Sequence, residues 1–548
     1  MKINLNTIAI DLTPILTGGE NGGAKIFVLE LIKQLALLAP KTTFILLTQK
    51  ASHAELSLLD ARNVRRIQVL DNQGLHANQR KIRKYVEKLL SIVPRILQTR
   101  LNRLLSVVDS RIKSIGHPLL LHNLGVQLLF CPFTAPVYSE AGIPTVSTIY
   151  DLQYKTYPEF FSQLDAAHRE RVFLDACKKS TMLSAISNYS REKAILFGNL
   201  DVQKIRTIYL RMAQRVSEVS IDKSSILKRF GLTAGQYFIY PANFWRHKNH
   251  EILLTAFGMA CGQGLSSKIK LICTGSPGER SIFLSNATKA MNLEGGIIFP
   301  GFVSTGELSV LLSNALGMIF PSLYEGFGLP VMEAMAVGVP VACSNLTSLP
   351  EVASSAAILF DPRVPSQIAR AMIDIERNDD LRSSLVNLGL DRADLFADSK
   401  KMAKEYWSLF NDAFTNYEGR NELTGMYADG WASNLLTLEV QTKYHSRIEL
   451  ELDAPAWLPQ EAVAIQFMEQ GKPLGGPYRL ERGKSIVITQ VINKNSKLCQ
   501  IKISPSFIPK NHNMGEDARE LTVLIKRCVL GQGNSGQDKV LFPEEQVL

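Results

Sequence analysis

The order of strand, glycine-rich loop, helix and strand at the start of the chain constrains the fold most strongly. Residues 3–11 are apolar enough for a buried strand, residues 24–38 have apolar helical periodicity, and residues 44–48 form the next apolar run. Strands that alternate with helices form parallel sheets covered by those helices. A second unit of this kind begins after about residue 215, with its first strand at 237–241. The sequence therefore predicts two α/β units.

From about residue 421 the pattern changes to short stretches in which apolar and polar residues alternate. Alternation of this kind is typical of half-buried strands, and several such strands in succession favour an all-β sandwich. The predicted strands are 436–441, 447–452, 485–491 and 500–504. We expect this sandwich-like module to span residues 421–531 and a disordered tail to occupy 532–548. Trp431 has two interpretations, a core side chain or a platform that stacks on a sugar.

The chain has features expected of a cytoplasmic protein. Its first residues lack the layout of a signal peptide, and no run of eighteen apolar residues is present. The seven cysteines are scattered, odd in number and free of any C-x-x-C pair. This pattern predicts reduced, mostly buried thiols rather than disulfides or a zinc site.

A strongly basic segment lies at about 77–117. Ten of its residues are basic and two, Glu87 and Asp109, are acidic, which gives a net charge of +8 within a chain of +10. Its apolar residues recur at helical spacing, with a break or kink near Pro94. A basic amphipathic helix suits an anionic membrane surface, but its apolar stripe can equally pack on its own domain. Nucleic acid is a weaker alternative because the segment lacks interleaved aromatic residues.

The run at 321–351 predicts a ligand site at the start of a short helix. Pro330 suits the first position of a helix and Gly338 the residue just after its end, so we expect a helix at about 330–337. It follows the turn Gly326, Phe327 and Gly328, where glycine lets a ligand approach the backbone. The free N–H groups of the first helical turn suit phosphate oxygens.

Two glutamates lie on either side of this turn. Glu333 is the only charged residue in a helix that is otherwise apolar, so it should be buried and hydrogen-bonded, for which a ribose diol offers two donors. Glu325 precedes it by eight residues and would lie at the other end of the same ligand. The structural alternative is a salt bridge for Glu333 and a turn cap for Glu325.

Glu325 and Glu333, within Pro-Ser-Leu-Tyr-Glu-Gly-Phe-Gly-Leu-Pro, resemble the E-x7-E motif of retaining glycosyltransferases of family 4, which have the GT-B fold. The resemblance covers about residues 5–418. It implies that Glu325 contacts the transferred sugar and that Glu333 contacts the ribose. It also implies an α/β fold of two facing Rossmann-like domains, which precede the C-terminal β module. The first is an acceptor domain at 1–212 that carries the basic insertion, and the second is a nucleotide-sugar domain at 213–418.

Lys248 matches the family lysine that clamps the donor diphosphate. The arginine that usually lies five residues earlier is absent, because Asn243 occupies that position. Whether Arg246 takes over this role is left open. The resemblance implies that Lys248 and the helix start at 327–329 stabilise the leaving diphosphate without a metal ion, together with Arg246 if it takes over that role.

Other positions carry the resemblance less completely. Family members often have His-Asp where this chain has Tyr150-Asp151, so the part played by the missing histidine is open. The glycine loop at 18–23 does not have the pattern G-x-G-x-x-G, which argues against a dinucleotide site. The resemblance implies that this loop lies over the donor phosphates. The alternative is a surface turn that binds no ligand. Val303 is expected beside the base. Candidate catalytic residues are Glu325, Lys248, Arg246 and Asp151, and candidate donor-binding residues are Glu333, Gly326, Phe327, Gly328, Leu329, Val303, Gly22 and Gly23.

The resemblance implies a retaining glycosyltransferase that needs no cofactor. The string at 240–250 is most similar to mannosyltransferases that use GDP-mannose in bacterial surface polysaccharide assembly, such as that of lipopolysaccharide. The expected partners are a nucleotide sugar, with GDP-mannose favoured, and a glycan or polyprenyl-diphosphate-linked acceptor, at the inner face of the cell membrane if the basic segment anchors the protein. The alternatives are a sugar phosphorylase on the same fold and a catalytically inactive sugar-binding or scaffold protein.

Overall fold

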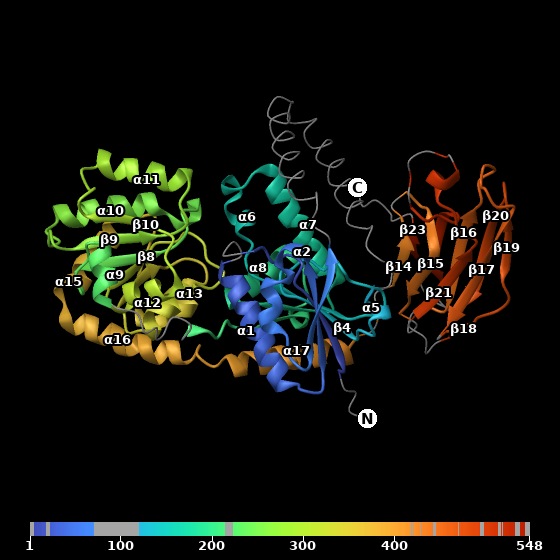
Figure 1. The fold of residues 1–548 in the computed structure, drawn as a ribbon, viewed down its shortest axis with the longest axis horizontal. Helices are drawn as coiled ribbons and strands as arrows, with labels where there is room; N and C mark the ends of the chain where they lie inside the picture. Colours follow the sequence, from blue (N-terminus) through green and yellow to red (C-terminus); the bar gives the residue numbers. More distant parts are fainter. Residues whose placement is uncertain are drawn as a thin grey trace.

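The structure is a computed structural model and describes residues 5–17, 22–70, 120–213, 223–417 and, apart from short gaps, 419–542. The basic segment at 77–117 lies outside the described residues, as do Gly18 and Gly19. Figure 1 shows three bodies in a row: the second α/β unit in green and yellow, the first in blue and teal, and the C-terminal module in orange and red.

The first unit is built on a seven-stranded parallel sheet with the strand order β3-β2-β1-β4-β5-β6-β7. Its central strands are buried on both faces, which is why they are continuous apolar runs rather than alternating ones. The strands are β1 Thr7–Asp11, β2 Thr43–Gln49, β3 Val64–Leu70, β4 Leu128–Cys131, β5 Thr145–Ile149, β6 Met182–Ala185 and β7 Ile205–Thr207. The helices are α1 Gly22–Leu38, α2 Lys50–His53, η1 Glu55–Leu59, α5 Leu120–Asn123, α6 Gln153–Thr156, η2 Pro158–Phe160, α7 Gln163–Lys179, α8 Asn188–Gly198 and η3 Val202–Lys204.

The second unit has a six-stranded parallel sheet with the order β10-β9-β8-β11-β12-β13, again covered by helices. Its strands are β8 Tyr237–Pro241, β9 Lys270–Thr274, β10 Ile297–Gly301, β11 Gly317–Phe320, β12 Val341–Ser344 and β13 Ala357–Phe360. Its helices are α9 Lys223–Arg229, η5 Arg246–Lys248, α10 His250–Gly262, α11 Glu279–Ala290, α12 Thr305–Ser313, α13 Leu329–Ala336, α14 Leu349–Ala353, η6 Ser354–Ala356, α15 Pro365–Arg377, α16 Asp379–Asp394 and α17 Ser399–Thr415. The expected pair of parallel α/β sheets is confirmed.

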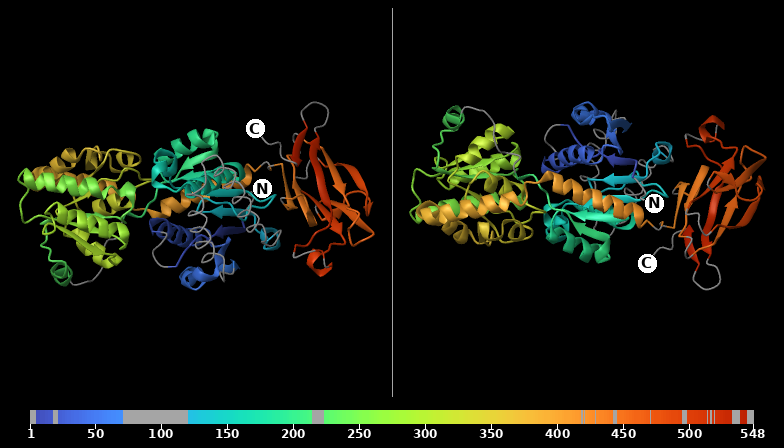
Figure 2. Two further views of the ribbon diagram at one scale, coloured as in Figure 1. Left: turned by 90° about the horizontal axis from the view of Figure 1, so that it is seen from above. Right: turned by 90° about the horizontal axis from the view of Figure 1, so that it is seen from below.

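The last of these helices, α17, packs on the first unit rather than the second. The Tyr406 hydroxyl lies 3.1 Å from Ser184 Oγ of β6, and Arg206 of β7 donates to Asp412 at 2.7 Å. Figure 2 shows α16 and α17 running along one side of both units. The chain therefore crosses back to the first unit through α17.

The C-terminal module consists of two antiparallel sheets with strand orders β14-β15-β21-β17-β18 and β20-β16-β22-β23, and β19 pairs with β17. Their inward-facing side chains form a separate hydrophobic core. The strands are β14 Glu422–Met426, β15 Ala432–Glu439, β16 Arg447–Asp453, β17 Ala462–Glu469, β18 Lys472–Pro473, β19 Tyr478–Glu481, β20 Ser485–Val491, β21 Leu498–Ser504, β22 Leu524–Gly531 and β23 Lys539–Phe542, with the short helix η7 Pro509–His512. The predicted sandwich-like fold is confirmed.

The disordered tail expected at 532–548 is wrong for residues 539–542. This stretch forms β23, which pairs antiparallel with β22, and its register places Cys528 opposite Phe542 and Leu530 opposite Lys539. The segment Lys-Val-Leu-Phe is too short to mark itself as a strand, and β22 supplies the edge on which it pairs.

The seven cysteines are all free, and six of them are buried, in agreement with the prediction of reduced thiols. None of the helices in the described ranges combines the length and hydropathy needed to cross a bilayer.

Candidate active site

The helix that follows the glycine turn is α13, and it begins one residue before the predicted start. Gly328 caps it with φ of +101°, a conformation that favours glycine, and a Cβ at this position would lie 2.5 Å from Leu349 Cδ2. Gly338, just beyond the helix, also has a positive φ of +73°. The turn and helix start therefore require glycine where the sequence indicated it.

The backbone around Glu325 is held by the loop that follows β12. Glu325 N–H donates to Thr347 Oγ1 at 3.1 Å, and the Ser348 hydroxyl donates to the carbonyls of Glu325 and Phe327 at 2.9 and 3.1 Å. Thr347 has φ of +58°, which is rare for a β-branched residue and costs on the order of 1–3 kcal/mol. The loop keeps this strained conformation while it fixes the position of Glu325.

Lys248 lies on a turn that is tied to the same segment. Leu323 N–H donates to the His247 carbonyl at 2.8 Å, and the Tyr240 hydroxyl donates to the Lys248 carbonyl at 2.7 Å. Asn249, with φ of +59°, sends its side-chain amide to the Pro321 carbonyl at 3.1 Å. The chain between β8 and α10 is thus fastened to the chain between β11 and α13.

These two supports bring Lys248 Nζ within 2.5 Å of Glu325 Oε1. The side chains are 13% and 12% exposed, so the ion pair is largely removed from solvent. A desolvated ion pair is held by strong attraction, and the loss of one partner leaves a buried charge. The two residues predicted to contact the donor diphosphate and the transferred sugar therefore contact each other.

Asp151, at the carboxyl end of β5 in the first unit, joins this group electrostatically. Burial raises the pKa of the Asp151 carboxyl, and the charge on Glu325 adds to that rise. The backbone N–H of Gln153, which donates to Asp151 Oδ1 at 3.3 Å, and the cations Arg169 and Lys248 oppose it. Asp151 thus lies in the field of both members of the ion pair.

Other members of the predicted set lie around this centre. Glu333 is 2% exposed, as expected for the one charged residue of an apolar helix. Arg246 is exposed on the same turn as Lys248, and Val303 is partly buried after β10. Asn243, which occupies the position of the family arginine, accepts a hydrogen bond from Ser276 N–H at 2.9 Å.

The two units meet at the glycine turn. A Cβ on Gly326 would lie 2.4 Å from the Tyr150 carbonyl oxygen, and one on Gly23 would lie 3.1 Å from Leu329 Cδ1. Ser190 Oγ donates to the Tyr150 carbonyl at 2.8 Å and lies 3.3 Å from the Gly326 carbonyl. Gly23 and the start of α13 are therefore neighbours, whereas Gly22 is exposed at the first position of α1.

Tyr150 does not place its hydroxyl where the family histidine is expected to act. Its ring meets Phe27 edge to face at 6.2 Å, and its hydroxyl is buried without a hydrogen-bond partner among the described residues. Burial, and then the nearby Tyr406, raise the pKa of this hydroxyl well above its usual range. Tyr150 thus contributes its backbone carbonyl to the junction and its ring to the core of the first unit.

Sequence reasoning missed two residues near the junction, one that bonds across it and one that acts on Asp151. Glu351 of α14 accepts hydrogen bonds from the Asn188 and Tyr189 N–H groups at 2.8 and 3.1 Å, so a side chain of the second unit caps α8 of the first. Arg169 of α7 is exposed, yet its charge lowers the pKa of Asp151. Neither residue belongs to a local motif, so only the fold identifies them. Ser187 also caps α8, because its hydroxyl accepts from Ser190 N–H at 3.0 Å.

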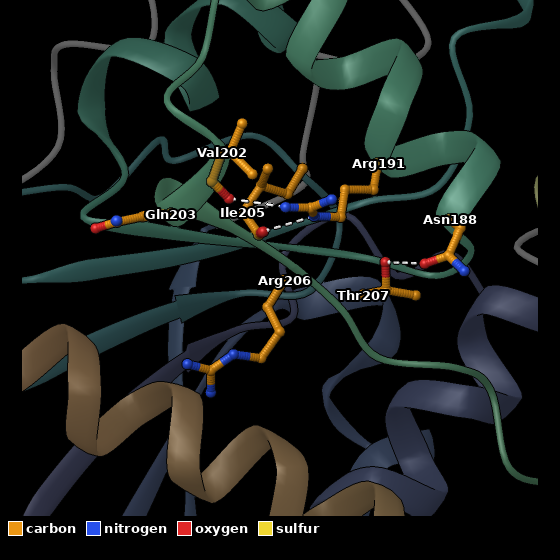
Figure 3. A pocket seen from close by; sticks show the side chains of 7 residues that line it. All are labelled: Asn188, Arg191, Val202, Gln203, Ile205, Arg206 and Thr207. Atoms are coloured by element: carbon orange, nitrogen blue, oxygen red, sulfur yellow. Dashed lines mark hydrogen bonds between the residues drawn. The ribbon is translucent and has the colours of Figure 1, made fainter.

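A separate hollow of about 490 Å³ lies beside β7 in the first unit. Figure 3 shows Arg191 of α8 directed at the carbonyls of Val202 and Ile205, both at 2.9 Å, and Thr207 beside Asn188. Arg206, which also lines this hollow, is paired with Asp412. Its arginines therefore support the edge of the sheet.

Comparison with known proteins agrees with this arrangement. Residues 224–390 match the sequence model of a family described as Glycosyl transferases group 1. The chain is 28% identical to O-antigen chain mannosyltransferase B of Escherichia coli over 253 residues, which is 46% of this chain and 66% of that protein. It is 25% identical to O-antigen chain mannosyltransferase RfbU of Salmonella typhimurium over 44% of this chain and 63% of the relative. The chain thus aligns with about two thirds, or slightly less, of the length of these two relatives.

Solved structures share the fold. HepE of Anabaena, in complex with UDP and glucose, superimposes with a TM-score of 0.54 at 16% identity, over 74% of this chain and 99% of that one. Sucrose-phosphate synthase of Thermosynechococcus elongatus gives a TM-score of 0.56 at 17% identity, over 75% of this chain and the whole of that one. The chain thus has the GT-B fold with an added β module, and its residues 224–390 are similar to the glycosyl transferases of group 1.

Proposed function

We propose that the protein is a retaining glycosyltransferase that moves mannose from GDP-mannose to a glycan or polyprenyl-diphosphate-linked acceptor in surface polysaccharide assembly. The ion pair between Lys248 and Glu325, located beside the start of α13 where the two units meet, is the observation that carries this proposal. The names of the two mannosyltransferase relatives support the choice of mannose.

In this proposal a bound donor takes over both members of the ion pair. The diphosphate oxygens attract Lys248 away from Glu325, and the freed carboxylate accepts hydrogen bonds from the hydroxyls of the sugar. Because both side chains are largely buried, neither charge is well solvated without its partner, so exchange of partners favours the bound state. The N–H groups at the start of α13 add positive potential toward the diphosphate.

Transfer breaks the bond between the anomeric carbon and the diphosphate oxygen and forms a bond to the acceptor oxygen on the same face of the sugar. The proton of the acceptor hydroxyl passes to the leaving diphosphate, which lies on that face. Lys248 and the start of α13 stabilise the charge that develops on the leaving diphosphate, while Glu325 stabilises the positive charge that develops at the ring. We assign Glu333 to the ribose, Val303 to the base and Asp151 to the acceptor side. Arg246, exposed next to Lys248, is assigned to the outer face of the diphosphate.

The direct test combines a panel of nucleotide sugars with the lipid fraction of polysaccharide-producing cells as acceptor. We expect GDP-mannose to raise the Tm more than UDP-glucose or GDP-fucose and to donate label to the lipid fraction. Addition of EDTA should leave the transfer rate unchanged. Release of sugar 1-phosphate that depends on added phosphate would indicate a phosphorylase instead, and the absence of both transfer and stabilisation would contradict the proposal.

We further propose that the basic segment at 77–117 holds the protein at an anionic membrane surface. Its net charge of +8 is the basis, since each basic residue near such a surface contributes about 1 kcal/mol. Deletion of residues 78–115 should abolish sedimentation with phosphatidylglycerol vesicles, whereas vesicles of phosphatidylcholine alone should not bind either protein. Equal sedimentation of both proteins would favour packing of the segment on its own domain.

A further inference from the structure

A hollow of about 310 Å³ lies in the C-terminal module, away from the junction of the α/β units. Trp457 is 51% exposed at its edge, although large aromatic side chains normally gain by burial. Trp431, by contrast, is 9% exposed and belongs to the core of the module. The hollow is lined by Trp431, Trp457, Pro509, Met514, Asp517 and Leu521.

The two tryptophans that line this hollow pack with Phe507 in a cluster of three aromatic rings. The ring of Trp457 lies 5.3 Å from that of Trp431 at an angle of 51°, and 6.2 Å from that of Phe507 at 78°. Trp431 and Phe507 also meet edge to face at 5.9 Å. Since both partners are buried, they hold Trp457 in place while it stays open to solvent. Binding at such a preorganised ring loses little conformational entropy.

A polar network orients Asp517, the one carboxylate among the described lining residues. Arg519 donates to Asp517 at 2.7 Å and to Asp429 at 2.8 Å, and its guanidinium lies over the Tyr427 ring at 4.8 Å. The hydrogen bond from Arg519 lowers the pKa of Asp517, so this carboxylate is ionised at neutral pH. Asp517 accepts from three N–H groups of Arg519, namely the backbone N–H, Nε and Nη2. Its two oxygens have about four lone-pair sites, which leaves room for one further donor.

We propose that this hollow binds a glycan, with a pyranose ring on Trp457 and its hydroxyls on Asp517. A pyranose has an apolar C–H face that suits an aromatic ring and a rim of hydroxyl donors that suits a carboxylate. The hollow offers this combination at a volume near the lower end for small-molecule sites. A proline-rich peptide also packs on tryptophan, but it has no hydroxyl to fill the remaining acceptor site of Asp517.

The occupant is the polysaccharide that the enzyme extends, and in this respect the inference rests on the proposed function. The module contacts the first α/β unit, since a Cβ on Gly142 would lie 3.2 Å from Leu498 Cδ1 of β21. The GT-B arrangement assigns this first unit to the acceptor. A glycan bound at Trp457 is therefore attached to the acceptor side of the enzyme. Binding there would raise the effective concentration of the chain end near the transfer site.

The test is titration calorimetry of the full-length protein with an α-linked manno-oligosaccharide, a gluco-oligosaccharide of equal length and a proline-rich peptide. Binding of one oligosaccharide should weaken at least tenfold in Trp457→Ala and several-fold in Asp517→Asn, and it should persist in Trp457→Phe. Val487→Ala, which removes a 60% exposed side chain from the same module, should bind like the wild type. The Asp517→Asn variant keeps the test valid if Trp457→Ala unfolds.

Absence of oligosaccharide binding to the wild type, equal binding to Trp457→Ala, or binding of the peptide alone would overturn the inference. Mannose transfer to a short acceptor is measured in parallel and should be equal in wild type and Trp457→Ala. If binding depends on Trp457 but no nucleotide sugar is used, the proposed function fails and the glycan site stands. If transfer occurs but no glycan binds, only the site fails.

Discussion

The two sides of the junction contribute different kinds of groups to the candidate site. The second α/β unit contributes charged side chains, Lys248 and Glu325, on turns whose backbones are fastened together. The first contributes mainly backbone, namely the Tyr150 carbonyl and the N–H groups of Asn188 and Tyr189, with Asp151 as its buried acid. The difference fits the proposal that the second unit binds the donor, while the contacts of the first unit set how closely the two units approach.

The largest effect is expected from the ion pair of the second unit. Lys248→Ala should lower kcat/KM by about two to three orders of magnitude, because it removes the cation that stabilises the leaving diphosphate. It also leaves Glu325 buried without its partner, so urea unfolding must be measured in parallel. In the double variant Lys248→Met/Glu325→Gln stability should recover while activity stays low. Activity of Lys248→Ala close to that of the wild type would contradict the assignment.

The first unit holds a buried acid whose effect depends on pH. Burial raises the pKa of Asp11 from 3.8 to about 6. The folded protein therefore keeps this proton to a higher pH than the unfolded chain does, and stability falls as the pH rises from 4 to 6. Relative to wild type, Asp11→Asn should gain up to about 3 kcal/mol in unfolding free energy between pH 4 and 7. Urea unfolding at each pH measures this gain, and the Asn variant of the exposed Asp380 serves as the control. If the unfolding free energies of Asp11→Asn and wild type change in parallel with pH, Asp11 is ionised in the folded protein.

Closure of the two units is tested at Gly326. A methyl group there would lie 2.4 Å from the Tyr150 carbonyl, so Gly326→Ala should hold the units apart at a cost of about 1–3 kcal/mol. Turnover should fall about tenfold to a hundredfold, and small-angle scattering should show a larger radius of gyration. Gly295→Ala, where the space for a methyl group is open, serves as control. An unchanged radius with normal turnover would show that this contact is not needed for closure.

The smallest effect is expected at the cap that joins the two units. Glu351→Ala removes the acceptor for two N–H groups of α8 and should cost about 1 kcal/mol of stability. Because the cap crosses the junction, we expect faster amide exchange at Asn188 and Tyr189, measured by hydrogen–deuterium exchange, while the core of the second unit stays protected. Protection equal to that of the wild type would indicate that water replaces the carboxylate.

Much of the second unit could be predicted because its turns carry local signals. The start of α13 was indicated by Pro330 and the glycines before it, and the turn of Lys248 by the string around it. The strained Thr347 and the cap Glu351 could not be predicted, since their roles depend on partners far away in the sequence. The ion pair itself was not foreseen either: both residues were expected to contact a ligand, and only the folded chain places them against each other.

The first unit and the β module show the same limit. Tyr150 was open at the sequence level because its orientation depends on Phe27 and Tyr406, which come from distant helices. In the β module, the alternation of apolar and polar residues indicated the strands. Trp431 had two interpretations at the sequence level, and the structure places its side chain in the core. The exposure of Trp457 was missed because a tryptophan between two strands gives no sign of which face it occupies. The domain boundaries and the roles of Arg246, Glu333 and Val303 stay predictions.

The packing of α17 on the first unit limits how the enzyme can move. The chain passes from the first unit to the second after residue 213 and returns through α17, so two covalent connections join the bodies. A pair of connections permits a rocking motion about the line between them and resists separation or free rotation. The β module follows α17 directly, so it should travel with the first unit. Under the two proposals, a glycan bound to the module would keep its position relative to the first unit. The second unit would rotate away to release the nucleoside diphosphate and bind another nucleotide sugar.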